Sequence, residues 1–578
     1  MKTAISGKEM VETRDAGRGA FRSGRAPTYH RRLEVILFTI AAALGICGSY
    51  VSRFAGVTID SIGYLDVAKT YLRHDWPSAV NLTWPPVFSW LLAAAFTMVH
   101  PTLRTEVPIA HAVQCVVYLA TLLAFRFCWK ELGKLRGTRP LTGQELRAWY
   151  IVGYTLFVVM LTPFSTLLTP DIATGFVVFL ATGLLARVAQ GQASTSKFLL
   201  LGLTLGFGYL VKTVFLPLGI AALGVTGLVA LKQRKFNRFL IAPLALLLVA
   251  GPWVLILSRS ARHFNWGGAG RVTYNGTVNN QQKLRSFDWA SMDWTEKDPD
   301  AWAKLIVTSP RVYRTDVLPN VTYSFIYDHA RVDQTPVHFS ARNELRAIAL
   351  NMKFYRFWFG LLQGGLLFVA AVHLFSLRRR AVAALAGNVH LFALPVFAIG
   401  LYTLVYAEGR LVAPFCVVLW GAWMAVVPVP RALTRLNATA WSVAALFLLL
   451  CGLPLIAESL FSRPDDIRGD LAVAEALQES GVERGSRIGI VGSTGFVWAH
   501  LLDAAIVAEV PAADEFAKCT PQQGNNVLEA MRSSGVRHVV SVEPGNPEVQ
   551  FRKLPHTGLW YRDLGKSHTT ASEPGSHD

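Results

Sequence analysis

Charged residues are scarce in this chain of 578 amino acids. Asp, Glu, Lys and Arg make up 16% of it, hydrophobic residues make up 52%, and the mean hydropathy is +0.35. Because a soluble protein carries about 25% charged residues, the deficit excludes a soluble fold for most of the chain. Cysteine is also sparse: there are six, without the CxxC spacing of a zinc site. The tail contains one cysteine, Cys519, which excludes a disulfide within the tail.

Apolar runs recur at the length needed to cross a hydrocarbon core of about 30 Å. They predict a polytopic α-helical membrane protein with eleven spans, at 33–51, 107–129, 148–164, 171–187, 197–211, 214–231, 238–258, 355–377, 385–405, 411–428 and 438–457. The net charge of +18 could indicate a nucleic-acid-binding protein. However, the basic residues gather in short loops between apolar runs, which is typical of cytoplasmic loops. We therefore expect membrane lipids, and no nucleic acid, as partners.

The basic loops also predict the topology. They contain Arg31 and Arg32, Lys130 to Arg147, Arg187 to Lys197, Lys232 to Arg238, Arg378 to Arg380, and Arg431 to Arg435. All of them fall on one side only if the 15-residue run 85–99 does not span, so we expect that run on or in the outer face. The N-terminus is then cytoplasmic and the C-terminal tail extracytoplasmic. A bacterial inner membrane is the expected location.

The chain divides into four predicted regions. Residues 1–32 form a disordered basic tail, 33–458 the membrane domain with outer loops at 52–84 and 259–354, 463–566 a small α/β domain, and 567–578 a disordered end. In the α/β domain, helices are predicted at 471–479 and 527–534 and strands at 487–491 and 536–542. The run Gly489-Ile-Val-Gly492-Ser-Thr-Gly495 has GxxGxxG spacing, and it predicts a tight turn rather than a dinucleotide loop.

Five ionisable residues fall at the outer ends of predicted spans or in the first outer loop: Asp60, Asp171, Lys212, Glu408 and Arg410. Charges at such places are costly, so they are candidates for function. The alternatives stay open: either Asp could cap a helix, Lys212 could snorkel to the interface, and the last two could form an interfacial ion pair. Other charges of the first outer loop, Asp66, Arg73 and His74, are expected at the surface.

The order of these residues resembles the GT-C superfamily of integral membrane glycosyltransferases, which includes protein O-mannosyltransferases and lipid A aminoarabinose transferases. The matching runs are Asp60 with Tyr64, then Trp84-Pro85-Pro86-Val87-Phe88-Ser89-Trp90, then the Gly-rich run from Gly202 to Lys212, and finally Glu408 to Pro414. Ser61 stands where mannosyltransferases have a second acid, and Leu411 stands where the last motif has Tyr.

The resemblance implies a GT-C-like fold and transfer of a hexose or pentose from a polyprenyl phosphate to a lipid, glycan or protein acceptor. It implies that Asp60 is the base of an inverting transfer. Lys212 and Arg410 would bind the donor phosphate. Asp171 would orient the acceptor or a partner cation, and Glu408 would bind or orient substrate. Tyr64 and Trp84 would pack on a sugar. No cofactor or resident metal is predicted, although a divalent cation stays open.

Two other functions remain as alternatives. A lipid-linked glycan ligase or polymerase would also place cations and a large loop on the outer face. A transporter or flippase would bury charges near the bilayer midplane, and many transporters consist of two related halves. The sequence contains no internal repeat. The positions of the charges therefore favour the glycosyltransferase.

Overall fold

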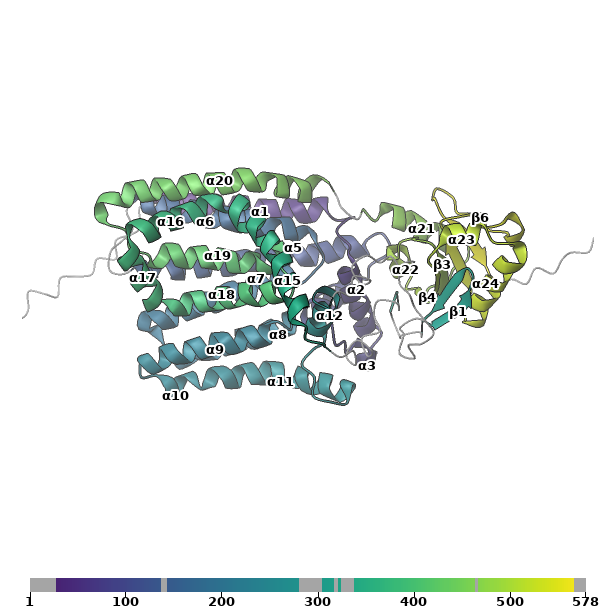
Figure 1. Cartoon of the computed structure of the whole chain (residues 1–578), viewed down its shortest axis with the longest axis horizontal. Helices are drawn as coiled ribbons and strands as arrows, with labels where there is room; N and C mark the ends of the chain where they lie inside the picture. The colour runs from purple at the N-terminus through teal and green to yellow at the C-terminus, as the bar shows by residue number, and fades with distance from the viewer. Residues whose placement is uncertain are drawn as a thin grey trace, which may run out of the picture.

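The computed structural model describes residues 28–136, 143–279, 304–315, 321–323, 337–462 and 466–565. A bundle of helices forms one end of the molecule, and a sheet with its covering helices forms the other (Figure 1). The tail predicted at 567–578 and almost all of the tail predicted at 1–32 lie outside the described residues.

Eight helical segments of the described chain are long and apolar enough to cross a membrane. They contain α1 (Thr28–Val51), α5 (Glu106–Gly133), α6 (Gly143–Leu161), α7 (Asp171–Arg187), α9 (Phe215–Lys232), α11 (Ile241–Ala261), α19 (Gly409–Val426) and α20 (Thr434–Phe461). Large apolar side chains are exposed on their outer surfaces, as Leu244 and Leu248 of α11 show. Such a surface suits lipid rather than water. An integral membrane protein, as predicted, is therefore confirmed.

The other predicted spans are present in altered form. Two more form bent helix pairs, which raise the number to ten if each pair is one span. The segment predicted at 197–211 is α8 (Thr195–Val211), an apolar helix of 17 residues. The run 85–99 forms α4 (Pro86–Val99), whose 14 residues are too few for a span. α4 packs against α5 and against α2 (Ile59–Leu72) of the first outer loop.

The two spans predicted at 355–377 and 385–405 are each interrupted by a sharp bend, which was not predicted from the sequence. The chain runs through α15 (Ala341–Tyr355) and the π-helical η6 (Arg356–Leu362), then turns by 84° into α16 (Gly364–Ser376). α17 (Arg378–Gly387) meets α18 (Val389–Leu404) at 83°. At the first bend Gln363 is fully buried, donates to the Trp358 carbonyl at 3.0 Å and accepts from Trp420 Nε1 at 2.6 Å. These bonds stabilise a break at Gln363-Gly364-Gly365, which interrupts the apolar run.

Basic turns lie at the end of the bundle that is farthest from the sheet. Figure 1 places α10 (Phe236–Phe239) and α17 there, with Arg238 and Arg378 to Arg380. The short helices α3 (Trp76–Ala79) and α12 (Ala269–Thr277) lie at the opposite end of the bundle, facing the soluble domain. This separation agrees with basic loops and tail on opposite sides of a membrane.

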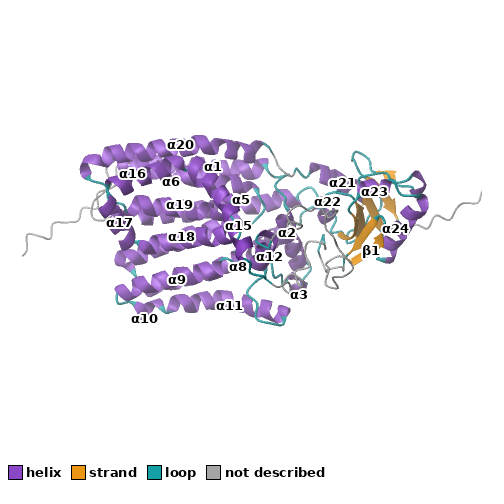
Figure 2. Ribbon diagram, viewed as in Figure 1, coloured by secondary structure: helices purple, strands orange, loops and turns teal. Residues whose placement is uncertain are grey.

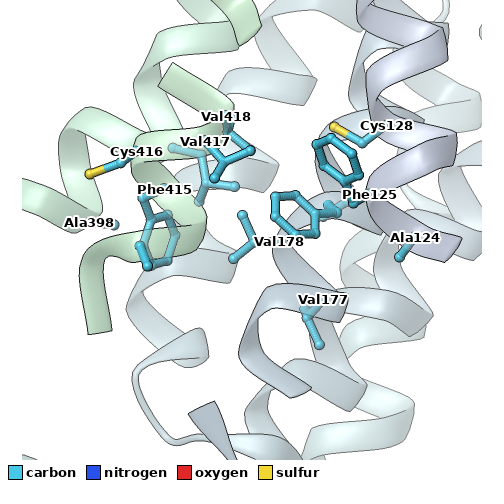
Figure 3. Packing of buried hydrophobic residues seen from close by; sticks show 14 of the residues in the cluster. Ala124, Phe125, Cys128, Val177, Val178, Ala398, Phe415, Cys416, Val417 and Val418 are labelled. Atoms are coloured by element: carbon cyan, nitrogen blue, oxygen red, sulfur yellow. The ribbon is translucent and has the colours of Figure 1, made fainter. Parts of the chain in front are cut away.

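The core of the bundle is aromatic and fixes the helices whose ends build the site. Phe125 of α5 lies beside Val178 of α7 and the apolar run of α19 around Phe415 (Figure 3). The ring of Phe125 is 4.9 Å from that of Phe157 and 5.5 Å from that of Phe179. Fully buried aromatic side chains such as these dominate packing energetics.

The soluble domain is built on a sheet (Figure 2). In the described residues the sheet has seven strands, in the order β1-β2-β4-β3-β5-β7-β6. Its centre is parallel: β4 (Ala505–Val510), β3 (Arg487–Val491) and β5 (His538–Ser541). Antiparallel strands flank it, namely β1 (Lys304–Thr308), β2 (Arg311–Arg314), β6 (Arg552–Lys553) and β7 (Trp560–Asp563). β1 and β2 belong to the large outer loop, so that loop completes a sheet that the sequence assigned to the tail alone.

Four helices accompany the sheet: α21 (Arg468–Glu479), α22 (Val497–Leu501), α23 (Ala513–Ala517) and α24 (Pro521–Ser533). The two helices and two strands predicted for the tail are confirmed within a few residues. The glycine run after β3 is the predicted tight turn, because Gly492 and Gly495 have φ of 75° and 70°. A Cβ added at Gly492 would lie 2.5 Å from Val542, so the turn also requires close approach.

Candidate active site at the outer helix ends

Asp60 is the second residue of α2, and Thr58 caps that helix. The Thr58 hydroxyl accepts from the Ser61 amide at 3.3 Å, and the Ser61 hydroxyl accepts from the Thr58 amide at 2.9 Å. The capping alternative for Asp60 is therefore wrong. Ser61, which stands where mannosyltransferases have an acid, is a fully buried part of the cap.

Arg410, the second residue of α19, joins three carboxylates. Its Nη1 lies 3.4 Å from Asp60 Oδ2 and 3.2 Å from Asp171 Oδ2. Its Nε lies 3.0 Å from Oε2 of Glu408, the residue that precedes α19. Residues that are 350 and 239 positions apart in the chain therefore meet at one guanidinium.

Asp171 is the first residue of α7 and holds the second cation. It forms an ion pair with Lys212, the residue that ends α8, and accepts from the Thr169 hydroxyl at 2.9 Å. Pro170 occupies the cap position, and the cap there has no side-chain hydrogen bond. Asp171 is thus not the helix cap; it is the residue that orients both cations.

The five side chains of this cluster, which we call the rim cluster, differ in exposure. Asp60 is 38% exposed and Glu408 35%, whereas Asp171 is 3% exposed. Asp60 and Glu408 are therefore accessible carboxylates, and Asp171 is the enclosed one. Burial raises the pKa of Asp60 above its ordinary value even though Arg410 opposes the rise. A carboxylate with a raised pKa is a better proton acceptor than one in water.

Tyr64 and Trp84 lie together beside the rim cluster. Their ring centroids are 5.2 Å apart, and Tyr64 also meets Phe88 edge-on at 5.5 Å. Tyr64 is only 4% exposed, so its ring has no open face for a sugar, contrary to the prediction. Burial and the nearby charge of Asp60 raise the pKa of the Tyr64 hydroxyl. Trp84 is half-buried and also packs against the soluble domain.

A second group of charges was missed by sequence reasoning. Asp66, which was expected at the surface, is 5% exposed and binds Thr322 of the large outer loop and His500 of the soluble domain. Lys69 and Glu106 belong to the same group. The spacing of Asp66, Lys69 and Arg73 places them on one face of α2, and this was the signal available in the sequence.

A cavity of about 410 Å³ lies on the soluble-domain side of the first turn of α2. Its lining is Val57, Thr58, Ile59, Asp466, Ile467, Asp470, Gly495, Phe496 and Val497. Burial raises the pKa of Asp470 to about 6, and its carboxylate accepts from the Trp498 amide at 3.2 Å. The described residues contain no group of three or more His, Cys, Asp or Glu side chains that could hold a metal ion.

No family model matches the sequence, and no curated protein matches it. Among solved structures, apo ArnT from Cupriavidus metallidurans has a TM-score of 0.50 and 11% identity, covering 91% of this chain and 97% of that one. ArnT bound to undecaprenyl phosphate has a TM-score of 0.45 and 14% identity, covering 93% and 98%. The apo oligosaccharyltransferase of Archaeoglobus fulgidus has a TM-score of 0.46 and 12% identity, covering 90% and 70%. The likeness to apo ArnT over nearly the whole chain confirms the predicted GT-C-like fold.

Proposed function

We propose that this protein is a glycosyltransferase that moves a sugar from a polyprenyl-phosphate-linked donor to an acceptor at the outer face of a membrane. The rim cluster is the observation that carries the proposal. It combines an accessible aspartate, Asp60, with two cations at helix ends. The phosphate of a membrane lipid lies at the depth of the headgroups, where helix ends are also found. ArnT, whose apo form has a similar fold, has also been solved with undecaprenyl phosphate.

Asp60 is the proposed base of an inverting transfer. Its carboxylate takes the proton of the acceptor hydroxyl while the acceptor oxygen forms a bond to the anomeric carbon. The bond from that carbon to the phosphate oxygen breaks, and the polyprenyl phosphate leaves with the electron pair. The exposure of Asp60 and its raised pKa suit this role, and the enclosure of Asp171 does not.

Lys212 and Arg410 are the proposed ligands of the donor phosphate. Both side chains are partly exposed, and Asp171 holds both from the buried side. The contacts of Arg410 to Asp60, at 3.4 and 3.5 Å, are long, so a phosphate can replace them at low cost. Charge-assisted bonds to phosphate are roughly twice as strong as neutral ones.

The cavity beside the first turn of α2 is the proposed acceptor side of the site. Residues 57–59, which line it, directly precede Asp60 in the chain. Apolar residues of the cavity suit the body of an acceptor, and the carboxyl group of Asp470 suits one of its hydroxyls. The acceptor is then bound between the membrane domain and the soluble domain.

The test is the release of free polyprenyl phosphate from a labelled lipid-linked sugar by the purified protein with a cell-extract acceptor. We expect Lys212→Ala and Arg410→Ala to weaken turnover, and Arg410→Lys to do so as well because the planar fork is lost. Lys553→Ala, which removes an exposed cation of β6, is the control. Wild-type turnover by the first two variants would make these residues interfacial anchors.

The same assay addresses the alternatives. A wild-type protein that releases no polyprenyl phosphate would favour a transporter, although the rim charges lie at helix ends rather than at mid-helix. A product that grows by whole glycans would favour a ligase or polymerase. Mass spectrometry of surface glycans in a deletion strain identifies the sugar and acceptor.

The proposed location is a bacterial inner membrane with a cytoplasmic N-terminus. Reporter fusions after Lys134 and Arg379 should report a cytoplasmic position, and a fusion after Ser462 an extracytoplasmic one. An extracytoplasmic result at Lys134 would contradict this topology.

A further inference from the structure

His500, a residue of the soluble domain, is held by the membrane domain at both ring nitrogens. Its Nδ1 lies 2.7 Å from Asp66 Oδ1 of α2, and its Nε2 lies 2.6 Å from Glu106 Oε1 at the start of α5. The side chain is 1% exposed. Its partners are 434 and 394 residues away in the chain, so the imidazole joins two domains and three helices.

With both carboxylates ionised, the two contacts fit a protonated ring. A neutral imidazole has one N–H, and it would set a lone pair against one of the two carboxylates. The imidazolium donates to both. Burial and the charge of Lys69 lower the pKa of His500, but Glu106 and Asp66 outweigh them and the pKa lies above its ordinary value.

Charges around the imidazolium complete a sealed group, which we call the seam cluster. Lys69 Nζ of α2 lies 3.0 Å from Glu106 Oε2 and 2.8 Å from Asp503 Oδ1, and donates to the His500 carbonyl at 2.9 Å. Thr322 donates its amide and hydroxyl to Asp66 at 2.9 and 2.7 Å. Arg73 and Arg484 reach Asp503 from outside, at 3.4 and 3.8 Å.

This cluster fixes the helix that carries Asp60. Asp66 and Lys69 occupy consecutive turns of α2, and Asp60 is in its first turn, about 9 Å from Asp66 along the axis. On the rim side, the contacts of Asp60 to Arg410 are 3.4 and 3.5 Å. The contacts of α2 in the seam cluster are short and enclosed, whereas those of Asp60 to Arg410 are long. The seam cluster therefore determines the position of the Asp60 carboxylate.

We infer that His500 is a positioning residue for the transfer reaction: its imidazolium, bound by Asp66 and Glu106, lets the soluble domain hold α2 and so places Asp60. The inference rests on the proposed function. A misplacement of about 1 Å can cost about 100-fold in rate. Loss of the imidazolium therefore lowers kcat. The donor cations Lys212 and Arg410 make no contact with the seam cluster in the described structure, so the donor KM should change little.

The test compares His500→Gln with His538→Gln in the full-length protein. His538 is a buried histidine of the same domain that bonds Tyr561 within the sheet, at 2.9 Å, and controls for general damage to the domain. We expect His500→Gln to lower kcat about 10- to 100-fold with the donor KM within about twofold of wild type. Equal kcat in wild type and His500→Gln, or an equal loss in His538→Gln, would overturn the inference.

A double variant separates positioning from loss of folded protein. If His500 acts through Asp60, adding His500→Gln to Asp60→Asn lowers the residual rate no further. A general loss of active protein would multiply with the Asp60→Asn effect, and a multiplied loss would contradict the inference.

Hydrogen exchange provides a measurement that does not need an active enzyme. His500→Gln should speed exchange of the amides at 59–72 and leave those at 521–533 of α24 unchanged. If His500→Gln does not fold, Asp503→Asn at the edge of the seam cluster should show a smaller increase in the same segment. If exchange at 59–72 is unchanged in His500→Gln, the inference is overturned even if the wild-type protein transfers sugar. If exchange changes but the wild-type protein transfers no sugar, His500 does hold α2 and the proposed function is wrong.

Discussion

The two charged clusters share α2 but differ in how far their side chains are closed off from water. In the rim cluster, two of the three carboxylates, Asp60 and Glu408, are more than a third exposed, and the contacts of Arg410 are 3.0 to 3.5 Å. In the seam cluster, five side chains are at most 15% exposed, and the contacts between them are 2.6 to 3.0 Å. They are Asp66, Lys69, Glu106, His500 and Asp503. Helix α2 thus contributes Asp60 to an accessible cluster at its start, and Asp66 and Lys69 to an enclosed cluster further along.

The difference indicates which charges are available to a ligand. In the seam cluster each charge is paired with an opposite charge and is shielded from water. A substrate that displaced one partner would therefore leave a buried charge unpaired, which is costly. In the rim cluster Asp60 is accessible and its contacts to Arg410 are long, so a phosphate or hydroxyl can replace that partner. Groups with a shifted pKa in an accessible site are therefore candidates for a catalytic role. Groups with a shifted pKa in an enclosed cluster are candidates for a structural role.

The largest effect is expected at the open carboxylate. Asp60→Asn preserves the shape of the side chain but removes the proton acceptor, which typically costs 10²–10⁴-fold in rate. The thermal midpoint should stay near that of wild type, because the side chain is partly exposed and its contacts are long. Transfer by purified protein at matched expression is the measurement. A wild-type rate would end the case for Asp60 as base.

In the seam cluster, a substitution is expected to lower the stability of the protein. Glu106→Gln leaves His500 and Lys69 without a carboxylate that both contact, and breaking a buried ion pair from one side typically costs about 3–5 kcal/mol. The thermal midpoint in detergent should fall well below wild type. Glu475→Gln, which breaks the exposed pair with Arg104, is the matched control and should have little effect. Equal midpoints for the two variants would show that the seam cluster does not stabilise the fold.

The rim residues were found from the sequence, whereas the seam cluster was missed although part of it had a signal. Lys212 and Arg410 stand at the ends of apolar runs, where a charge is costly and is therefore a candidate for function. Glu106 also stands at the end of an apolar run, and Asp66 and Lys69 have helical spacing, but His500 lies in a soluble segment without such a signal, and only tertiary structure brings it to them. The strands β1 and β2 escaped prediction for the same reason: they are short, and pairing with β4 rather than local pattern forms them. The bend at Gln363 coincides with Gln363-Gly364-Gly365, which interrupts the apolar run but was included in one predicted span.

The pH dependence of stability sharpens the comparison further. The pKa of His500 is raised in the folded protein, where Asp66, Glu106, Lys69 and Asp503 surround it. Its stabilisation is complete below the unfolded pKa of about 6.5 and is lost as pH rises through the higher folded value. The thermal midpoint of wild type should therefore exceed that of His500→Gln most at low pH, and the difference should shrink in alkaline buffer. A difference that grows with pH would contradict a buried imidazolium.

The smallest effect is expected in the cavity between the two clusters, at Asp470. Burial raises its pKa to about 6, so the side chain is ionised at pH 8 and largely protonated at pH 5. Asp470→Asn keeps an acceptor for the Trp498 amide but removes the charge. If an acceptor hydroxyl donates to this carboxylate, loss of one charge-assisted hydrogen bond, about 1.5 kcal/mol or more, raises the acceptor KM roughly tenfold at pH 8. Wild type already resembles the variant at pH 5, so there the two should nearly agree.

Asp514→Asn, at an exposed position of α23, controls for the change of charge on the soluble domain. The donor KM should not change in either variant, because the donor cations lie on the rim. An acceptor KM at pH 8 that is the same in wild type and Asp470→Asn would remove Asp470 from acceptor binding. A change that is equal at pH 5 and pH 8 would assign the effect to packing of α21 rather than to the carboxylate, since packing does not follow the ionisation of Asp470.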